Sequence, residues 1–136
     1  MKTWLEQLRM WWRQRQTLGR RGERAAARHL RRNGYRIVAR NLSRRIGEID
    51  ILAEDRSSGA LAVVEVKTTT GDEPPPETHV HRDKQRKLTM LAGDLMRRYG
   101  LDDRTIRFDV IGIVWPTDAP KPTRITHHVN AFEALG

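Results

Sequence analysis

The pattern of apolar and polar positions along the chain changes period several times. From about residue 35 to residue 68, apolar residues alternate with polar ones or form short unbroken apolar runs, which is typical of β-strands. This pattern predicts three strands, over Tyr35–Leu42, Gly47–Ala53 and Ala60–Thr68. The polar run Arg56-Ser57-Ser58-Gly59 predicts a turn that joins the last two strands into a hairpin.

Helical spacing of apolar residues flanks these strands on both sides. Gly19 and Gly22 bracket the start of a helix that runs to about Arg32, and Asn33-Gly34 is a good stop signal. A longer helix is predicted over Arg82–Tyr99. Its expected buried residues are Leu88, Leu91, Ala92, Leu95 and Tyr99.

The last part of the chain predicts two more strands. Ile106–Trp115 is strongly apolar, as expected of an inner strand, and Arg124–Val129 predicts a short edge strand. Residues 69–80 contain three consecutive prolines and predict a loop. The resulting order is α-β-β-β-α-β with one further strand. It indicates an α/β fold with a mixed central sheet flanked by helices.

The chain divides into two parts by composition. Residues 1–17 predict an amphipathic helical extension rich in Trp and Arg, with Trp4, Leu8 and Trp11 at helical spacing. Residues 18–136 then form a single domain. We expect the extension to pack back onto this domain, and the alternatives are contact with a protein partner or with a membrane surface.

The amino-acid composition limits which disulfide and metal sites the chain can form. The chain contains no cysteine, so disulfides and thiolate metal sites are excluded. A metal would need carboxylate, imidazole or carbonyl ligands, which favours Mg²⁺ or Mn²⁺. We find neither a transmembrane apolar run nor a signal-peptide pattern, so the expected location is the cytoplasm.

Positive charge is concentrated in the first third of the chain. Residues 1–45 carry 14 Lys and Arg against 2 acids, a balance of +12, whereas residues 46–136 carry 12 basic and 15 acidic side chains. Such an arginine-rich segment favours a polyanionic partner. The candidate nucleic-acid contacts are Arg20, Arg21, Arg44, Arg45 and Lys84. A solvated basic helix face and binding to phospholipid are the alternatives.

The predicted hairpin brings charged residues together. If Ser57-Ser58 forms its tip, Asp50 lies opposite Glu65 and Glu48 lies opposite Lys67. Two carboxylates at that distance repel by roughly 3 kcal/mol at an effective dielectric of 20, and a divalent metal would relieve this repulsion. A solvated surface hairpin is the alternative, but the strand leading to Glu65 is too apolar for one.

A third acid lies on the predicted first helix. Glu23 precedes Ala26, Ala27 and Leu30 at helical spacing, which directs its carboxylate towards the sheet. The alternative is that Glu23 interacts with the positive end of its own helix. Asp109, in an apolar strand, is expected to make a structural hydrogen bond, and His127 and His128 are expected at the surface.

Several blocks of the sequence resemble a known family of small bacterial proteins, the YraN family. The blocks are Gly22-Glu23, Asn33-Gly34-Tyr35, Arg40-Asn41, Gly47-Glu48-Ile49-Asp50, Val64-Glu65-Val66-Lys67, Lys84 and Phe108-Asp109-Val110. They occur in the family's order over about residues 18–115. The family is similar to the PD-(D/E)XK nuclease superfamily, and particularly to archaeal Holliday-junction resolvases.

The resemblance implies a restriction-endonuclease-like core and a Mg²⁺- or Mn²⁺-dependent endonuclease acting on structured DNA. It implies Asp50 and Glu65 as metal ligands, the Val66 carbonyl as a third ligand, Lys67 as the catalytic lysine, and Glu23 as the helix-one acid. A homodimer is expected by analogy with resolvases. Thr68-Thr69-Thr70 stands where members of the family tend to carry an arginine. This departure bears on substrate binding more than on metal binding.

Two other functions remain open at this point. The chain could be a non-catalytic module that keeps a nuclease-like fold and binds nucleic acid through its basic half. It could instead be an interaction protein recruited to a partner or membrane by its N-terminal extension. Nucleic-acid binding that is sensitive to salt and independent of Mg²⁺ would favour the non-catalytic module. Loss of localisation on deletion of residues 1–16 would favour the interaction protein.

Overall fold

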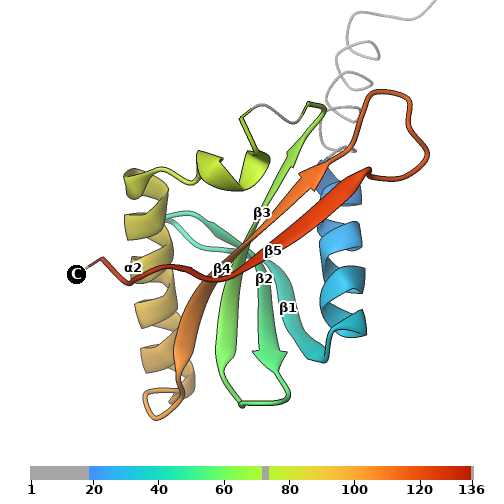
Figure 1. Ribbon diagram of the computed structural model, residues 1–136. Coiled ribbons are helices and arrows are strands. Elements are labelled where there is room, and N and C mark those ends of the chain that lie inside the picture. Colours follow the sequence, from blue (N-terminus) through green and yellow to red (C-terminus); the bar gives the residue numbers. More distant parts are fainter. Residues whose placement is uncertain (1–18, 72–73, 136) are drawn as a thin grey trace, which may run out of the picture.

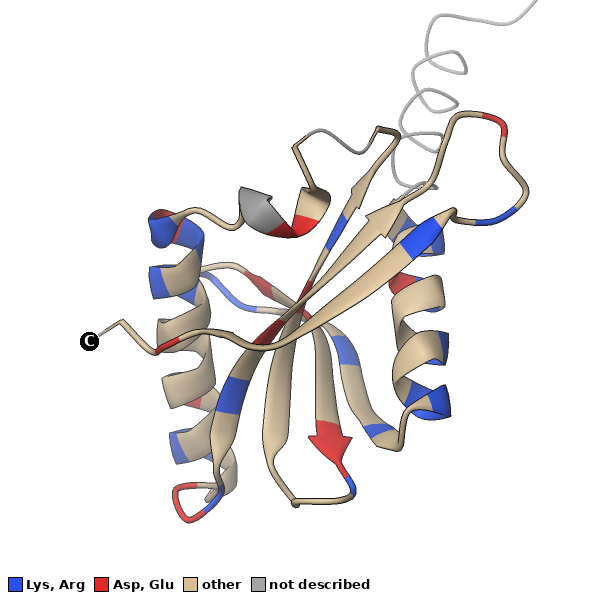
Figure 2. Cartoon of the chain, in the orientation of Figure 1, with Lys and Arg blue, Asp and Glu red and all other residues tan. Residues whose placement is uncertain are grey.

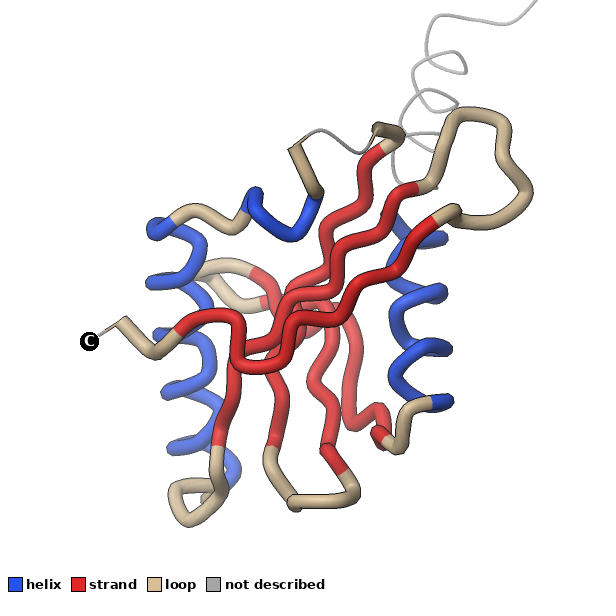
Figure 3. The backbone as a smooth tube through the Cα atoms, viewed as in Figure 1, coloured by secondary structure: helices blue, strands red, loops and turns tan. Residues whose placement is uncertain are grey.

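A five-stranded sheet lies between two helices (Figures 1 and 3). The computed structural model describes residues 19–71 and 74–135. The strand order is β1-β2-β3-β4-β5. The strands are β1 (Tyr35–Ser43), β2 (Glu48–Asp55), β3 (Leu61–Thr69), β4 (Ile106–Val114) and β5 (Arg124–Phe132). This arrangement confirms the predicted α/β architecture, with a mixed sheet flanked by helices.

The sheet is mixed because of one crossover. β3 and β4 are parallel, and every other neighbouring pair is antiparallel. Parallel neighbours require a long connection, which here contains α2 (Arg82–Tyr99). Gly100 ends α2 in the left-handed conformation, with φ 64°, which glycine adopts readily at the end of a helix.

Each face of the sheet is covered by one helix. The helix over residues 19–32 buries Ala26, Ala27 and Leu30 against one face, together with Ile51, Ala53, Val64 and Ile111. On the other face, α2 buries Leu88, Leu91, Ala92 and Leu95 against Leu52, Val63 and Phe108. The inner strands are therefore apolar on both faces, which explains their unbroken apolar runs.

The hairpin of β2 and β3 has the predicted register. Ile51 pairs with Val64 and Glu54 with Leu61. The last hydrogen bond of the hairpin joins the Asp55 N–H to the Ala60 carbonyl at 2.9 Å. The connection therefore spans residues 56–59 and is longer than the two-residue tip considered above. The extra residues are added symmetrically, so the register does not shift.

Some local expectations are wrong. Strand alternation predicts that Ile49 and Ile51 share one face of β2 and that Leu52 lies on the other. Ile49 instead packs with Leu52 on the α2 side while Ile51 packs on the opposite side, so regular alternation breaks at Asp50. Tyr99 is 61% exposed because it is the last residue of α2, beyond the part that covers the sheet.

Two connections also differ from the prediction. β5 continues to Phe132, three residues past the predicted end, because Phe132 stacks on Phe108 of the neighbouring strand with ring centroids 5.1 Å apart. The proline-rich segment contains a short 3₁₀ helix, η1 (Pro76–His79). The proposed extension over residues 1–17 lies outside the described residues. Among the described residues, no helix is long and apolar enough to cross a membrane.

Candidate active site

The site forms where β2 and β3 separate. Their main-chain pairing ends at Ile51 and Val64. The carboxylate of Asp50, the residue before Ile51, then accepts a hydrogen bond from the Val66 N–H, with an N–Oδ2 distance of 2.9 Å. A side chain thus replaces a main-chain partner, which fixes Asp50 beside Glu65.

Glu65 lies between two lysines. It is only 3% exposed, and its Oε1 atom lies 3.7 Å from the Nζ atom of Lys67 and 3.7 Å from that of Lys84. Lys67 follows on the same face of β3, as strand alternation predicts. Lys84 comes from the first turn of α2. Lys84 is a candidate nucleic-acid contact from the sequence, and its ammonium group lies beside Glu65.

Glu23 reaches the same place because the first helix approaches β3 closely. Gly22 packs directly against Thr68, so closely that a Cβ atom at position 22 would overlap the Thr68 hydroxyl. Ala26 and Leu30, one and two turns later, are fully buried against the sheet. The predicted apolar stripe therefore does carry a carboxylate towards the sheet.

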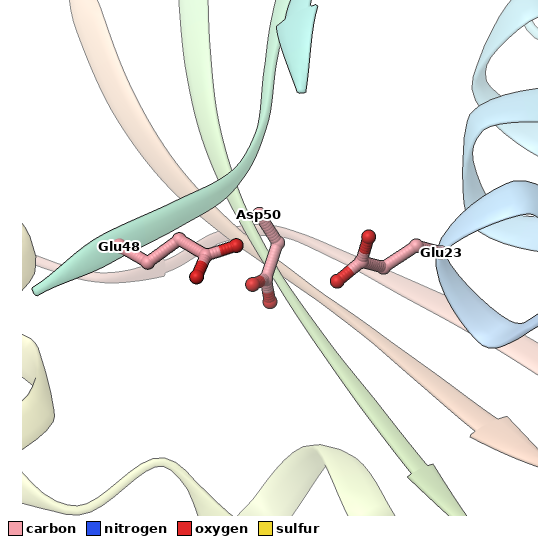
Figure 4. A group of neighbouring side chains, drawn as sticks. All are labelled: Glu23, Glu48 and Asp50. Atoms are coloured by element: carbon pink, nitrogen blue, oxygen red, sulfur yellow. The ribbon is translucent and has the colours of Figure 1, made fainter. Parts of the chain in front are cut away.

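A further carboxylate, Glu48, joins the group. Oxygen atoms of Glu23, Glu48 and Asp50 lie within 4.8 Å of one another (Figure 4). With its amide nitrogen turned towards the acids, Asn41 donates to Glu48 Oε1 at 2.9 Å and to Glu23 Oε2 at 2.8 Å. The expected pairing of Glu48 with Lys67 is wrong, because β2 has already left β3 at this point.

The sequence does contain a signal for Glu48 and Asn41. Glu48 stands two residues before Asp50, which places both on one side of an extended strand. Asn41 has φ 52°, a left-handed conformation that asparagine adopts more readily than most residues. Both residues belong to the blocks that carry the family resemblance, although no role was expected for either.

Glu23, Asp50, Glu65 and Lys67 border one cavity of about 380 Å³, and Glu48 and Asn41 line the neighbouring one. The first of these cavities is lined by Gly19, Glu23, Asp50, Glu65, Val66, Lys67 and Thr68. The structure therefore brings together all the residues expected to be catalytic or metal-binding.

Burial is the main cause of the raised pKa values in the site, and neighbouring carboxylates add to it for Glu65 and Glu23. Burial, followed by the charge of Asp50, raises the pKa of Glu65 to about 7, although Lys84 and Lys67 act in the opposite direction. Burial also raises the pKa of Asp50, against the lowering effect of the Val66 N–H. The pKa of Glu23 is raised as well, first by burial and then by Asp50 and Glu48. Such groups take up either a proton or a cation.

Comparison with known proteins places the chain in a family. The model of the uncharacterised protein family UPF0102 matches residues 22–113. The chain belongs to this family. It is 43% identical over 120 residues to a UPF0102 protein of Rhodopirellula baltica, covering 88% of this chain and 72% of the relative. It is also similar to UPF0102 proteins of Desulfosudis oleivorans (44% over 122 residues, covering 89% and 94%) and Geobacter sulfurreducens (45% over 118 residues, covering 85% and 88%).

The acidic cavity of this UPF0102 chain fits a hard divalent cation. All of its charged oxygen donors are carboxylates, which Mg²⁺ prefers. Glu65 Oε2 is buried without a hydrogen-bond partner in the described part of the chain. A buried charged oxygen without a partner is unfavourable, and a bound cation would satisfy it.

The predicted nucleic-acid contacts of the UPF0102 chain lie in different places. Arg20 lines a neighbouring cavity with Glu23 and Glu48. Arg21 stacks on Trp115, with its guanidinium carbon 4.2 Å from the ring centroid. The remaining two, Arg44 and Arg45, lie in the connection between β1 and β2.

The two histidines of β5 differ from each other. His128 is largely exposed, as expected, with 46% of its side chain accessible. His127 is not a surface residue, because its side chain is 11% exposed and its Nε2 atom lies 2.8 Å from Asp109 Oδ2. Asp109 also accepts hydrogen bonds from Arg107 and from the Asn130 N–H. This agrees with the structural role expected for Asp109.

Proposed function

We propose that this protein is a Mg²⁺- or Mn²⁺-dependent endonuclease that hydrolyses phosphodiester bonds of structured DNA. The observation that supports this most is the meeting of Asp50, Glu65 and Lys67 at one cavity, on two strands that separate there. Carboxylates that hold a metal beside a lysine are the groups that phosphodiester hydrolysis needs.

The roles proposed for the residues are those that the family resemblance implies. Asp50, Glu65 and the Val66 carbonyl would hold the metal, and Glu23 would supply the helix-one carboxylate. When bound, Mg²⁺ would lower the pKa of a water molecule and offset negative charge on the phosphate. Lys67 would orient the attacking water or balance the charge that develops on the phosphate oxygens.

The test is a cleavage assay on linear, single-stranded and four-way-junction DNA with Mg²⁺ or Mn²⁺. Asp50→Ala and Glu65→Ala should each abolish cleavage while DNA binding in EDTA is retained or tightened. Asp102→Ala, an exposed acid in the connection between α2 and β4, is the matched control and should cleave like wild type.

Equal cleavage by wild type and both site variants would contradict the proposal. So would a wild-type protein that cleaves none of the substrates and shows no heat of Mg²⁺ binding by calorimetry. If such a protein still bound DNA in a salt-sensitive way, the better description would be a non-catalytic binding module.

A further inference from the structure

A second hollow lies between the first helix and the loop from β4 to β5. Its volume is about 470 Å³. Basic side chains of the helix form one wall, and the loop with the end of β4 forms the other. It is lined by Arg21, Arg24, Ala25, Arg28, His29, Arg32, Trp115, Pro120, Lys121, Pro122 and Ile125. We call this hollow the basic groove.

The far wall of the basic groove is fixed by hydrogen bonds. Trp115 Nε1 donates to the Ala119 carbonyl at 2.8 Å, and the Ala119 N–H donates to the Pro116 carbonyl at 3.0 Å. Arg21 reaches across from the helix, contacting the Trp115 ring and donating to the same Ala119 carbonyl at 3.4 Å. The groove is therefore a built feature that ties the loop to the helix.

The positive charges of the basic groove are not neutralised. Its lining contains no acidic residue. Within the described residues, Arg24, Arg28, Arg32 and Lys121 make no ion pair, and the three arginines are exposed. Figure 2 shows basic positions recurring along this helix. Unpaired arginines held close together repel one another, and an anionic ligand would relieve that repulsion.

The arginines follow the helix at regular intervals. Arg21, Arg24, Arg28 and Arg32 are three or four residues apart, so they share one face. At a rise of 1.5 Å per residue, Arg21 to Arg32 spans about 16 Å. This length exceeds the spacing of neighbouring phosphates in a nucleic-acid strand, so the stripe can contact several phosphates in a row. A linear polyanion fits this length better than a single phosphate group.

The basic groove continues towards the candidate active site. Arg24 lines both the groove and a neighbouring cavity that contains Glu23 and Glu48. Gly19 and Glu23 in turn line both that cavity and the one that contains Asp50. A chain of hollows therefore leads around the first helix from the acidic cluster to the arginines.

We propose that the basic groove binds the sugar-phosphate backbone of a nucleic-acid strand at a distance from the phosphodiester bond that is cleaved. The choice of nucleic acid as the polyanion rests on the proposed function. Trp115 is only 8% exposed and already covered by Arg21, so it offers no free ring face to a base. Recognition in the groove is therefore by phosphate contacts and independent of base sequence.

The test compares two double variants of equal charge. Arg28→Ala/Arg32→Ala removes two groove arginines, and Arg97→Ala/Arg98→Ala removes two exposed arginines from the end of α2. Binding of fluorescein-labelled duplex DNA is measured by anisotropy in EDTA over a range of salt concentrations. The groove variant should reduce the slope of log K against log salt by about 2, whereas the control should leave it nearly unchanged.

The EDTA conditions separate this proposal from the nuclease proposal, because no metal-dependent step is measured. Equal slopes for wild type and the groove variant would overturn the groove proposal even if Asp50→Ala abolishes cleavage. Conversely, the groove proposal stands if the slope falls and no cleavage is ever found. Vesicles containing phosphatidylserine form the second arm. Loss of vesicle binding with unchanged DNA binding in the groove variant would overturn the proposal in favour of a lipid surface.

Discussion

Glu65 shows at the scale of single residues how the acidic cluster limits the stability of the fold. Its carboxyl group is 3% exposed, and burial with the nearby Asp50 raises its pKa to about 7 from 4.5. In the folded, metal-free protein the ionised form is therefore unfavourable. The resulting loss of stability is absent below pH 4.5 and complete above about pH 7, because the folded state holds its proton more tightly than the unfolded state.

Glu65→Gln should therefore stabilise the metal-free protein at alkaline pH. The shift from 4.5 to about 7 corresponds to about 3 kcal/mol at most, since one pKa unit is 1.36 kcal/mol. Urea unfolding in EDTA should show the largest gain above pH 7 and little gain near pH 4.5. Excess Mg²⁺ should stabilise wild type and not the variant. A variant that is less stable than wild type at every pH would contradict this account.

Strand alternation was sufficient to predict some residues of the site and not others. It placed Glu65 and Lys67 on one face. The hairpin register brought Asp50 close to Glu65, although the main-chain pairing ends one residue earlier, at Ile51 and Val64. Strand alternation could not predict Lys84, whose contact with Glu65 depends on how α2 packs across the sheet. It also misplaced Glu48, because the separation of β2 from β3 is a tertiary feature.

At the scale of elements, the close contact of Gly22 with Thr68 of β3 helps the first helix to position Glu23. A side chain at position 22 would overlap that of Thr68, so Thr68, the helix or the strand would have to move. In the sequence, Gly19 and Gly22 indicate only the start of a helix. The structure shows that position 22 needs a glycine because the helix packs closely against Thr68 of β3.

Gly22→Ala should therefore displace the helix from β3. We expect a loss of about 1–3 kcal/mol in unfolding free energy, which is typical of overpacking, together with weaker Mg²⁺ binding. Gly93→Ala in α2 is the matched control, because its Cβ would meet only the far end of Arg97, at 3.4 Å. It should be neutral or stabilising by up to about 1 kcal/mol. Adding Thr68→Ala to Gly22→Ala should restore part of the loss, and a double variant no better than Gly22→Ala would contradict the contact.

The elements themselves were predicted with few errors, because both faces of the sheet are buried and the helices have clear stop signals. The antiparallel hairpin and the parallel pair across α2 follow from connection length. The errors occur where contacts between residues far apart in the sequence determine the end of a strand or the burial of a side chain. β5 extends to stack Phe132 on Phe108, and His127 is buried because Asp109 on β4 accepts its hydrogen bond.

At the scale of the whole molecule, a second charged network ties the sheet together away from the acidic cavity. Arg107 on β4 pairs with Asp109 at 2.9 Å, with Asp55 of β2 at 3.1 Å, and donates to the Tyr35 hydroxyl of β1 at 2.6 Å. His127 of β5 completes the network on Asp109. Four strands are thereby linked by one network of oppositely charged and hydrogen-bonded groups.

Pairing reverses the sign of the pH dependence in this network. Hydrogen bonds from Ser57 and then Arg107 hold the pKa of Asp55 at about 2. His127 and Arg107 outweigh burial and lower the pKa of Asp109. The stability that Asp55 contributes is therefore fully present above about pH 3.8 and is lost as the pH falls towards 2. The contribution of Asp109 is lost on acidification as well, because its pKa is also lowered in the folded state. Acid weakens this network, whereas alkali weakens the metal-free acidic cluster.

Asp109→Asn tests whether the network supports the fold and not the chemistry. It removes the charge that Arg107 and His127 share while keeping the shape of the side chain, and breaking a buried pair in this way costs about 3–5 kcal/mol. Urea unfolding at neutral pH should show that loss, and the further loss on acidification should be smaller than in wild type. Asp102→Asn, which changes an exposed acid, should behave like wild type.

The Mg²⁺ affinity of Asp109→Asn, measured at a temperature where this variant is still folded, should be unchanged, because none of the network residues lines the acidic cavity. A variant of wild-type stability with altered Mg²⁺ binding would mean that this network belongs to the site.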